Sequence, residues 1–156
     1  MTKGRRKLRF DHLEDVLDDV DTLLAGHRTL GRWSLAQILN HLSISIRYTV
    51  DGFPGRTAPW LIRKTLGAGV VRLMLATRYI AEGVKLPAEY QPVSEDLAAE
   101  VKLLREAIAR FAVAPEPLAM HPFIGSMSHR RWVQFHCIHC AHHLSFAVPV
   151  SSANAI

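Results

Sequence analysis

The sequence has little cysteine, no long apolar run free of charged residues, and no long alternation of apolar and polar residues. Its 156 residues contain only Cys137 and Cys140, too few for a disulfide framework, which indicates a reducing compartment. No nucleophile elbow, P-loop or dinucleotide fingerprint is present. No alternation of apolar and polar residues is long enough to predict a sheet. These absences argue against a disulfide-stabilised secreted scaffold, a P-loop enzyme and a sheet protein.

Charged residues interrupt the longest apolar stretch. Residues 60–80 contain Arg63, Lys64, Arg72 and Arg78, and a membrane span of this length would not carry four central charges. We therefore interpret the stretch as an amphipathic helix or helix pair and expect no membrane partner. Acidic residues, not an apolar run, follow the basic start of the chain, which argues against a signal peptide.

The net charge is +5, and much of it comes from a basic arm over residues 1–9. The basic residues of this arm are Lys3, Arg5, Arg6, Lys7 and Arg9. Such an arm can contact nucleic acid or a membrane surface, but it is more often a solvated, flexible terminus. No aromatic residue interleaves with it. We therefore predict a flexible arm and no nucleic-acid partner.

Helical periodicity dominates the rest of the chain. Apolar residues recur every three to four positions over about residues 10–25 and again over residues 35–49. The second run starts with Ser34 and Gln37 at the spacing of a capping box. Residues 60–80 show the same period. The prediction is an all-α fold, a four-helix bundle with an extra helical insertion after the second helix.

Small residues indicate where these helices begin or change. Gly67 and Gly69 predict a break or kink in the insertion. Ser94 and Ser128 are the predicted N-caps of the two remaining helices. The helix that follows Ser128 is predicted to end at Phe146.

Two loops and two ends complete the predicted organisation. Residues 81–93 form a loop that could cover a site, and residues 112–127 form another. One domain is expected over residues 10–148, followed by a flexible tail over residues 149–156.

The last predicted helix is unusually rich in histidine. Four histidines fall within eight residues: His136, His139, His142 and His143. Helical spacing places a largely aromatic set on one face: Trp132, Phe135, His139, His143 and Phe146. An aromatic face packs into a core, where an unpaired imidazole costs about 1–3 kcal/mol. A divalent metal ion would satisfy several of these imidazoles at once.

Spacing suggests which histidines could share a metal ion. His139 and His143 stand at i and i+4, and His41 lies at the edge of the apolar face of the second helix. Three neutral imidazoles with open positions describe a catalytic-type zinc, nickel or iron site. His136 and His142 compete for the third position. The alternative is that all of these histidines are hydrogen-bonded packing residues.

Cys137 and Cys140 form a C-x-x-C pair in mid-helix. A redox pair usually follows a strand at a helix start, so we interpret both as core residues. Two alternatives are that Cys140 approaches the metal, or that both cysteines join two histidines in a structural zinc site. The second would have poor tetrahedral geometry, because its ligands come from one or two turns.

Two separated motifs resemble the DinB-like (YfiT-like) superfamily of metal-binding four-helix bundles. The first is Trp33-Ser34-Leu35-Ala36-Gln37-Ile38-Leu39-Asn40-His41-Leu42, and the second, about a hundred residues later, is His139-x-x-x-His143. Residues 121–128 are closer to one uncharacterised branch of that superfamily. The resemblance covers about residues 19–146.

The resemblance implies a metal site and a chemistry. In that superfamily one histidine of the second helix and two of the last helix bind a divalent metal, often zinc or nickel; here these are His41, His139 and His143. Characterised relatives are thiol-dependent transferases and isomerases that use bacterial low-molecular-weight thiols, whose pKa the metal would lower. The family also implies a bacterial cytoplasmic protein and, often, a dimer. The insertion at residues 60–80 departs from the better-known members.

Two functional hypotheses follow. In the first, the protein is a metal-dependent transferase or hydrolase acting on a small-molecule substrate or thiol, with His121 or His142 as catalytic proton donor or acceptor. In the second, the bundle binds a small ligand or serves a stress response without catalysis, and its metal is structural or absent. An exchangeable, solvent-derived metal ligand would distinguish them.

Overall fold

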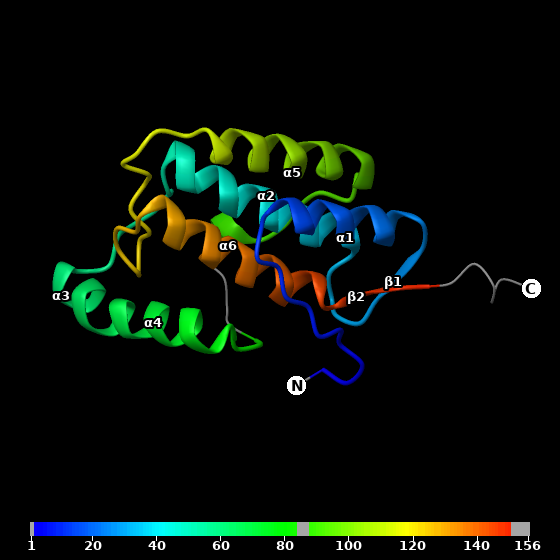
Figure 1. Ribbon diagram of the computed structural model, residues 1–156, viewed down its shortest axis with the longest axis horizontal. Coiled ribbons are helices and arrows are strands. Elements are labelled where there is room, and N and C mark those ends of the chain that lie inside the picture. The colour runs from blue at the N-terminus through cyan, green and yellow to red at the C-terminus, as the bar shows by residue number, and fades with distance from the viewer. Residues whose placement is uncertain (1, 84–87, 151–156) are drawn as a thin grey trace, which may run out of the picture.

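A computed structural model describes residues 2–83 and 88–150, and in these ranges the chain is mostly helical with one small sheet (Figure 1). The elements are α1 (Glu14–Leu24), β1 (His27–Thr29), α2 (Leu35–Asp51), α3 (Trp60–Ile62), a π-helical segment (Arg63–Gly67), α4 (Ala68–Thr77), a 3-10 helix (Ala88–Tyr90), α5 (Leu97–Ala112), α6 (His129–Leu144) and β2 (Ala147–Pro149). The prediction of a helical protein is confirmed, although the predicted helix ends shift by a few residues.

Helices α1, α2, α5 and α6 enclose the apolar core. Helix α2 packs along α5 and against α6, and α1 contacts both α5 and α6. The core draws on all four helices, with Val20, Leu42, Leu104 and Trp132 fully buried. Burial of apolar surface, worth about 25 cal/mol per Å², holds this packing together.

The capping box at the start of α2 is confirmed. Ser34 Oγ accepts from the Gln37 backbone N–H at 3.2 Å, and Gln37 Oε1 accepts from the Ser34 backbone N–H at 3.1 Å. A cap of this kind stabilises a helix by about 1 kcal/mol. It fixes where α2 begins, and therefore which face His41 occupies.

The two serine caps predicted for the later helices differ from the structure. Helix α5 is capped by Asp96, whose Oδ1 accepts from the Ala99 N–H at 3.0 Å, so the prediction of Ser94 is wrong. A carboxylate is favoured there because it also interacts with the positive end of the helix dipole. Ser128 does stand at the N-cap of α6, but its side chain makes no capping hydrogen bond.

The insertion is helical from Trp60 to Thr77 and packs against α6, with Val71 and Met74 joining the apolar core (Figure 1). In place of the predicted break, it contains a π-helical segment that ends at Gly67. A Cβ at Gly67 would overlap the carbonyl oxygen of Phe123, so the helix reaches this loop only because the residue has no side chain. Gly69, by contrast, has open space around it. Within residues 2–83 and 88–150, no helix is both long and apolar enough to cross a bilayer.

The small sheet was not expected from the sequence. Strands β1 and β2 pair antiparallel, from His27 opposite Pro149 to Thr29 opposite Ala147. Three-residue strands are too short to show an alternating pattern. The predicted tail is therefore wrong at Pro149 and at Val150, whose N–H donates to the Gly26 carbonyl at 2.9 Å. The rest of that prediction, residues 151–156, lies outside the described residues.

The basic arm is partly attached to the domain. The Arg6 guanidinium donates to both carboxylate oxygens of Asp19, at 2.6 and 2.7 Å, and to the carbonyls of Leu144 and Ala147. Arg5 donates to Ser145 Oγ at 2.9 Å and forms an ion pair with Glu82. The arginines are held because a guanidinium can serve several acceptors at once. The expectation of a solvated arm is thus wrong for the two arginines, whereas Lys3, Lys7 and Arg9 are exposed.

Candidate metal centre

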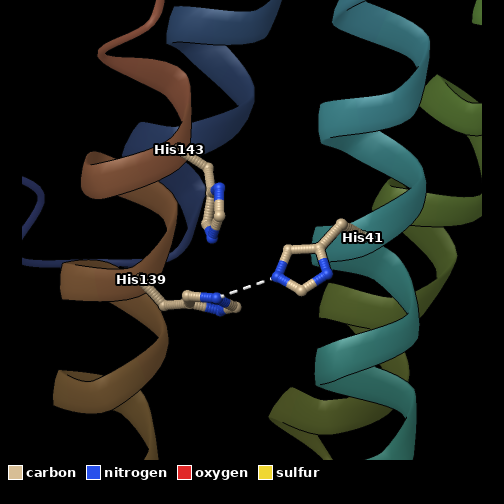
Figure 2. A group of neighbouring side chains, drawn as sticks. All are labelled: His41, His139 and His143. Carbon is tan, nitrogen blue, oxygen red and sulfur yellow. Dashed lines mark hydrogen bonds between the residues drawn. The ribbon is translucent and has the colours of Figure 1, made fainter. Parts of the chain in front are cut away.

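Three imidazoles from two helices converge at one point between α2 and α6. Figure 2 shows His41 projecting from α2 toward His139 and His143 of α6. The Nε2 atoms of His41 and His139 lie 3.2 Å apart, and one nitrogen of each of the three rings lies within 4.8 Å of the others. Within residues 2–83 and 88–150 no other set of three histidine, cysteine or acidic residues has this geometry. The structure therefore brings together the three histidines that the sequence predicted.

A backbone carbonyl orients His41. Its Nδ1 lies 2.9 Å from the carbonyl oxygen of Tyr90. Because a carbonyl only accepts, the proton of His41 is on Nδ1, and Nε2 presents a lone pair toward the other two rings. Metal-binding histidines commonly make this kind of hydrogen bond through the nitrogen that does not bind the metal. Tyr90 belongs to the predicted covering loop, residues 81–93, of which residues 84–87 lie outside the described residues.

The contact between His41 and His139 fixes a second proton. His41 Nε2 accepts, so His139 Nε2–H is the donor across the 3.2 Å contact. His139 Nδ1 is then an acceptor, and it is buried without a partner among the described residues. If a metal ion were held by the Nε2 atoms of both rings, the His139 proton would move from Nε2 to Nδ1, so that the ring stayed neutral.

Burial keeps all three rings in the form that a metal requires. Loss of solvation lowers the pKa of His41, although the Tyr90 carbonyl opposes the effect. Burial, followed by the charges of the neighbouring histidines, holds the pKa values of His139 and His143 well below their usual range. The three imidazoles are therefore neutral near neutral pH, as metal ligands must be.

The separations suit a small divalent cation. Imidazole nitrogens bind zinc at about 2.0–2.1 Å, so two tetrahedral ligands stand about 3.3 Å apart. The 3.2 Å between His41 and His139 already fits, and the nitrogen of the third ring lies within 4.8 Å of both. His41 is buried, and His139 and His143 are half-buried.

Aromatic side chains enclose the three histidines. Trp33 stacks on His143 with 5.4 Å between ring centroids and 16° between planes, and it lies 5.2 Å from the His41 ring. Phe135 lies 5.7 Å from the His139 ring. The sequence patterns alone indicate no role for Trp33 in the site. Its position directly before the N-cap of α2 was the available signal, since such a residue folds back over the first turns of the helix.

A family match covers the whole of this site. The profile of a family described as "Protein of unknown function (DUF1569)" matches residues 2–150. The chain belongs to this family. Comparison with curated proteins and with solved structures gave no match. The region matched by DUF1569 therefore contains His41, His139 and His143, but the family description assigns these residues no activity.

His142 lies at the edge of the three histidines in this DUF1569 chain. Its ring packs edge-on to His143 at 4.8 Å between centroids. Burial, with the nearby positive charge of Arg5, lowers its pKa to about 4. Arg5 also donates to the His142 carbonyl at 2.9 Å, which holds the end of α6 in place. His142 is the predicted catalytic histidine that contacts one of the three.

His121, the other predicted catalytic histidine, has a different position. Its Nδ1 accepts from the backbone N–H groups of Phe123 and Ile124, both at 3.1 Å, and so shapes the loop before α6. Phe135 packs against both His121 and His139, with 5.9 Å and 5.7 Å between ring centroids. Burial lowers the pKa of His121 to about 4.

His136 does not join the three histidines either. It is fully buried, and its Nε2 lies 3.0 Å from Thr49 Oγ1. The Thr49 hydroxyl donates to the Ser45 carbonyl at 3.2 Å, so His136 Nε2–H is the donor to Thr49. Burial lowers the pKa of His136 to about 3.

The two cysteines are packing residues, as predicted. Cys137 and Cys140 are both buried and free. Burial raises the pKa of the Cys137 thiol to about 11, and raises that of Cys140 further. Thiols that stay protonated are poor metal ligands and poor nucleophiles. Neither belongs to the group of three ligands found among the described residues.

Proposed function

We propose that the protein binds one divalent metal ion through His41, His139 and His143, and that this ion serves a reaction on a small-molecule substrate. The observation that carries the proposal is the convergence of three neutral imidazoles from two helices, with two Nε2 atoms 3.2 Å apart. Neutral imidazole suits zinc, nickel and iron, in agreement with the resemblance to DinB-like proteins.

Three protein ligands leave coordination positions for water or for the sulfur of a low-molecular-weight thiol. When bound there, the ion would lower the pKa of that water or thiol and so supply a nucleophile near neutral pH. A transferase with a thiol co-substrate is the first candidate, and a hydrolase is the second.

The chain's own residues would position the substrate and move a proton. Trp33 forms an aromatic wall on His143, against which an apolar part of a substrate can pack. His142 is the proposed proton donor or acceptor, because its ring packs against His143 at the edge of the site. His121 is a weaker candidate, because its ring packs against Phe135, which in turn packs against His139.

The packing of α1, α2, α5 and α6 supports the inference of a DinB-like four-helix bundle. The two halves of the site come from α2 and α6, the same relation that the sequence motifs suggest. In this proposal, α3 and α4 are an addition to the bundle. A homodimer, which the resemblance implies, is part of the same proposal.

A non-catalytic metal is the second candidate function. The buried position of His41 and the stacking of Trp33 on His143 favour a closed site with a structural ion. The two candidates predict different coordination, because a structural site is closed whereas a catalytic site keeps an exchangeable position.

Metal content tests the proposal directly. Elemental mass spectrometry of protein purified without an affinity tag should show about one equivalent of zinc, nickel or iron. His41→Ala, His139→Ala and His143→Ala should each lose it while keeping their helix content. His121→Ala is the matched control, a buried histidine outside the group, and should keep the metal. Absence of metal from the wild type, even after zinc is added, would refute the proposal.

Cobalt substitution separates the two candidate functions. Cobalt(II) bound at the three histidines should change its visible spectrum when a small thiol is added, if a position is open. An unchanged spectrum would indicate a closed shell and a structural ion. A spectral change that persists in His142→Gln, accompanied by loss of turnover in a thiol-transfer screen, would assign proton transfer to His142.

A further inference from the structure

The outer side of the insertion helix carries a row of exposed apolar side chains, called here the apolar flank. Ile62, Leu66, Val70 and Leu73 recur at intervals of four and three residues, and their exposed fractions are 40, 60, 44 and 65%. Residues at this spacing share one side of a helix. Trp60, at the start of the helix, is 62% exposed. Large apolar side chains gathered in this way mark an interaction surface.

The opposite flank attaches the helix to the domain. Gly67, Val71 and Met74 are buried there, and the carbonyl of Phe123 lies directly against Gly67. The exposed flank is therefore held in a fixed orientation. In Figure 1, α3 and α4 lie along one side of the molecule, away from α1 and α5.

Basic residues accompany this apolar flank in the sequence, and among them Arg78 is paired with a carboxylate, that of Asp11. Between residues 52 and 81 the sequence holds five basic residues and no acidic residue. Arg56, Lys64 and Arg72 are exposed. Long basic side chains beside an apolar strip can keep their charges in water while their stems cover the strip's margin.

The basic arm extends the charged margin beyond the end of α4. Thr2 and Arg5 both bond to Glu82, which follows the helix by a few residues. This attachment places the exposed Lys3 near the C-terminal end of the insertion. The arm therefore adds a cation to the same region, although it comes from a distant part of the sequence.

We propose that the flank of Ile62, Leu66, Val70 and Leu73 docks on an anionic lipid surface. An apolar strip with an aromatic residue at one end and a basic border is the pattern of helices that lie in the interface of a membrane. Anionic headgroups would supply the negative charge that residues 52–81 lack. The expectation of no membrane partner rested on the charges that exclude a span, and those charges favour a helix that lies flat on the surface.

A second copy of the chain fits the flank less well. In a two-fold dimer the same patch faces itself, so Lys64 and Arg72 would approach the basic residues of the other copy. Residues 52–81 provide no carboxylate to pair with them. Like charges at close range disfavour that contact, whereas a lipid surface of opposite charge favours docking.

Vesicle sedimentation tests the proposal. The full chain should bind vesicles of equal parts phosphatidylcholine and phosphatidylglycerol at least about tenfold more strongly than vesicles of phosphatidylcholine alone, and high salt should weaken the binding. Trp60 fluorescence should shift to the blue on binding, and Trp60→Phe should lose the shift, because Trp33 is half-buried and Trp132 fully buried.

Variants separate the apolar and charged parts of the surface. Leu66→Ser/Leu73→Ser should abolish binding, and Lys64→Gln/Arg72→Gln should weaken it roughly fivefold for each charge removed. Val113→Ser is the matched control, since Val113 is 83% exposed but lies outside the flank. Circular dichroism and metal content should stay unchanged in all of them, so that a failure of vesicle binding is distinct from a failure of the metal site.

Three results would overturn the proposal. The first is absence of binding to either vesicle. The second is equal binding to both, which would leave the basic border without a role. The third is a dimer, measured by light scattering, that Leu66→Ser/Leu73→Ser dissociates while vesicle binding is absent or unchanged. That result would assign the flank to a second copy.

Discussion

Helix α6 carries histidines of two kinds, which differ in what their nitrogens meet. Near its middle, His136 donates to Thr49, and at its start His129 Nε2 lies 3.1 Å from the Phe111 carbonyl. Further along, His139 and His143 meet other imidazoles, and His139 Nδ1 has no partner among the described residues. Nδ1 of His136 is also buried without a partner among the described residues, so the two kinds differ in the partner of the paired nitrogen: a hydroxyl or carbonyl in the first pair, another imidazole in the second.

The comparison shows that a buried histidine is assigned by its partners and not by its burial. Burial lowers the pKa of both His136 and His139, so electrostatics alone does not separate a packing histidine from a ligand. A hydroxyl or carbonyl partner satisfies one imidazole nitrogen, whereas several imidazoles facing one another need a shared proton or a cation. A change of residue or of pH can perturb either of these two kinds of histidine separately.

The largest effect is expected at His139. His139→Ala should lower metal affinity by more than about a hundredfold, because loss of even an outer partner of a ligand costs 10–100-fold. It should alter the stability of metal-free protein much less, since the hydrogen bond it removes joins His139 only to the half-satisfied imidazole of His41. Isothermal titration with zinc and urea unfolding measure the two quantities. Equal losses in both would assign His139 to packing.

Acid should destabilise the metal-free protein through His136 and His121. Their folded-state pKa values are lowered to about 3 and about 4, so the unfolded chain takes up protons first as the pH falls. The free energy of unfolding should be highest above pH 6.5 and fall by up to about 1.4 kcal/mol per pH unit for each histidine as the pH drops below it. Urea unfolding between pH 7 and about pH 4.5, above the range where carboxylates protonate, measures the slope. A flat profile would contradict the prediction.

His136→Ala should lower the free energy of unfolding by about 2–4 kcal/mol. The change leaves a cavity beside Trp132, which stacks on the imidazole at 5.3 Å, and removes the partner of Thr49. The slope of stability between pH 6.5 and pH 4.5 should also become shallower. Metal content should be retained, and a loss of metal would show that the two kinds of histidine are coupled.

The smallest effect is expected at Trp33. Trp33→Ala should weaken metal binding by about tenfold, as an outer partner of two ligands does, and Trp33→Phe should restore most of it. The reason is the stacked ring on His143, which limits its rotation. Competition with a chromophoric chelator measures the affinities. Unchanged affinity in the alanine variant would restrict Trp33 to contact with substrate.

Local patterns predicted the helices and the three converging histidines. The capping box fixed the face of α2 that holds His41, and the i, i+4 rule placed His139 beside His143. Neither pattern could identify the Tyr90 carbonyl, because a backbone group leaves no trace in the sequence. The cap of α5 was misplaced because Ser94 and Asp96 both suit an N-cap, and only the path of the chain selects between them.

Features that depend on distant contacts were missed. The attachment of Arg5 and Arg6 to the end of α6 joins residues more than a hundred positions apart, and no local pattern records it. The same is true of the β1–β2 pairing. The approach of Phe123 to Gly67 comes from outside the helix, so the sequence predicted only a break or kink there and not this contact.

The pairing of β1 with β2 has a consequence for synthesis on the ribosome. His27 is made about 120 residues before Pro149, its partner in the sheet. At about 5–20 residues per second, β1 waits several seconds to tens of seconds for that partner. Helix α6, with two of the three converging histidines, immediately precedes β2 and arrives almost as late. Until then α1, α2 and α5 expose the apolar surfaces that α6 later covers. During this interval the nascent chain presents apolar surface that a chaperone can bind.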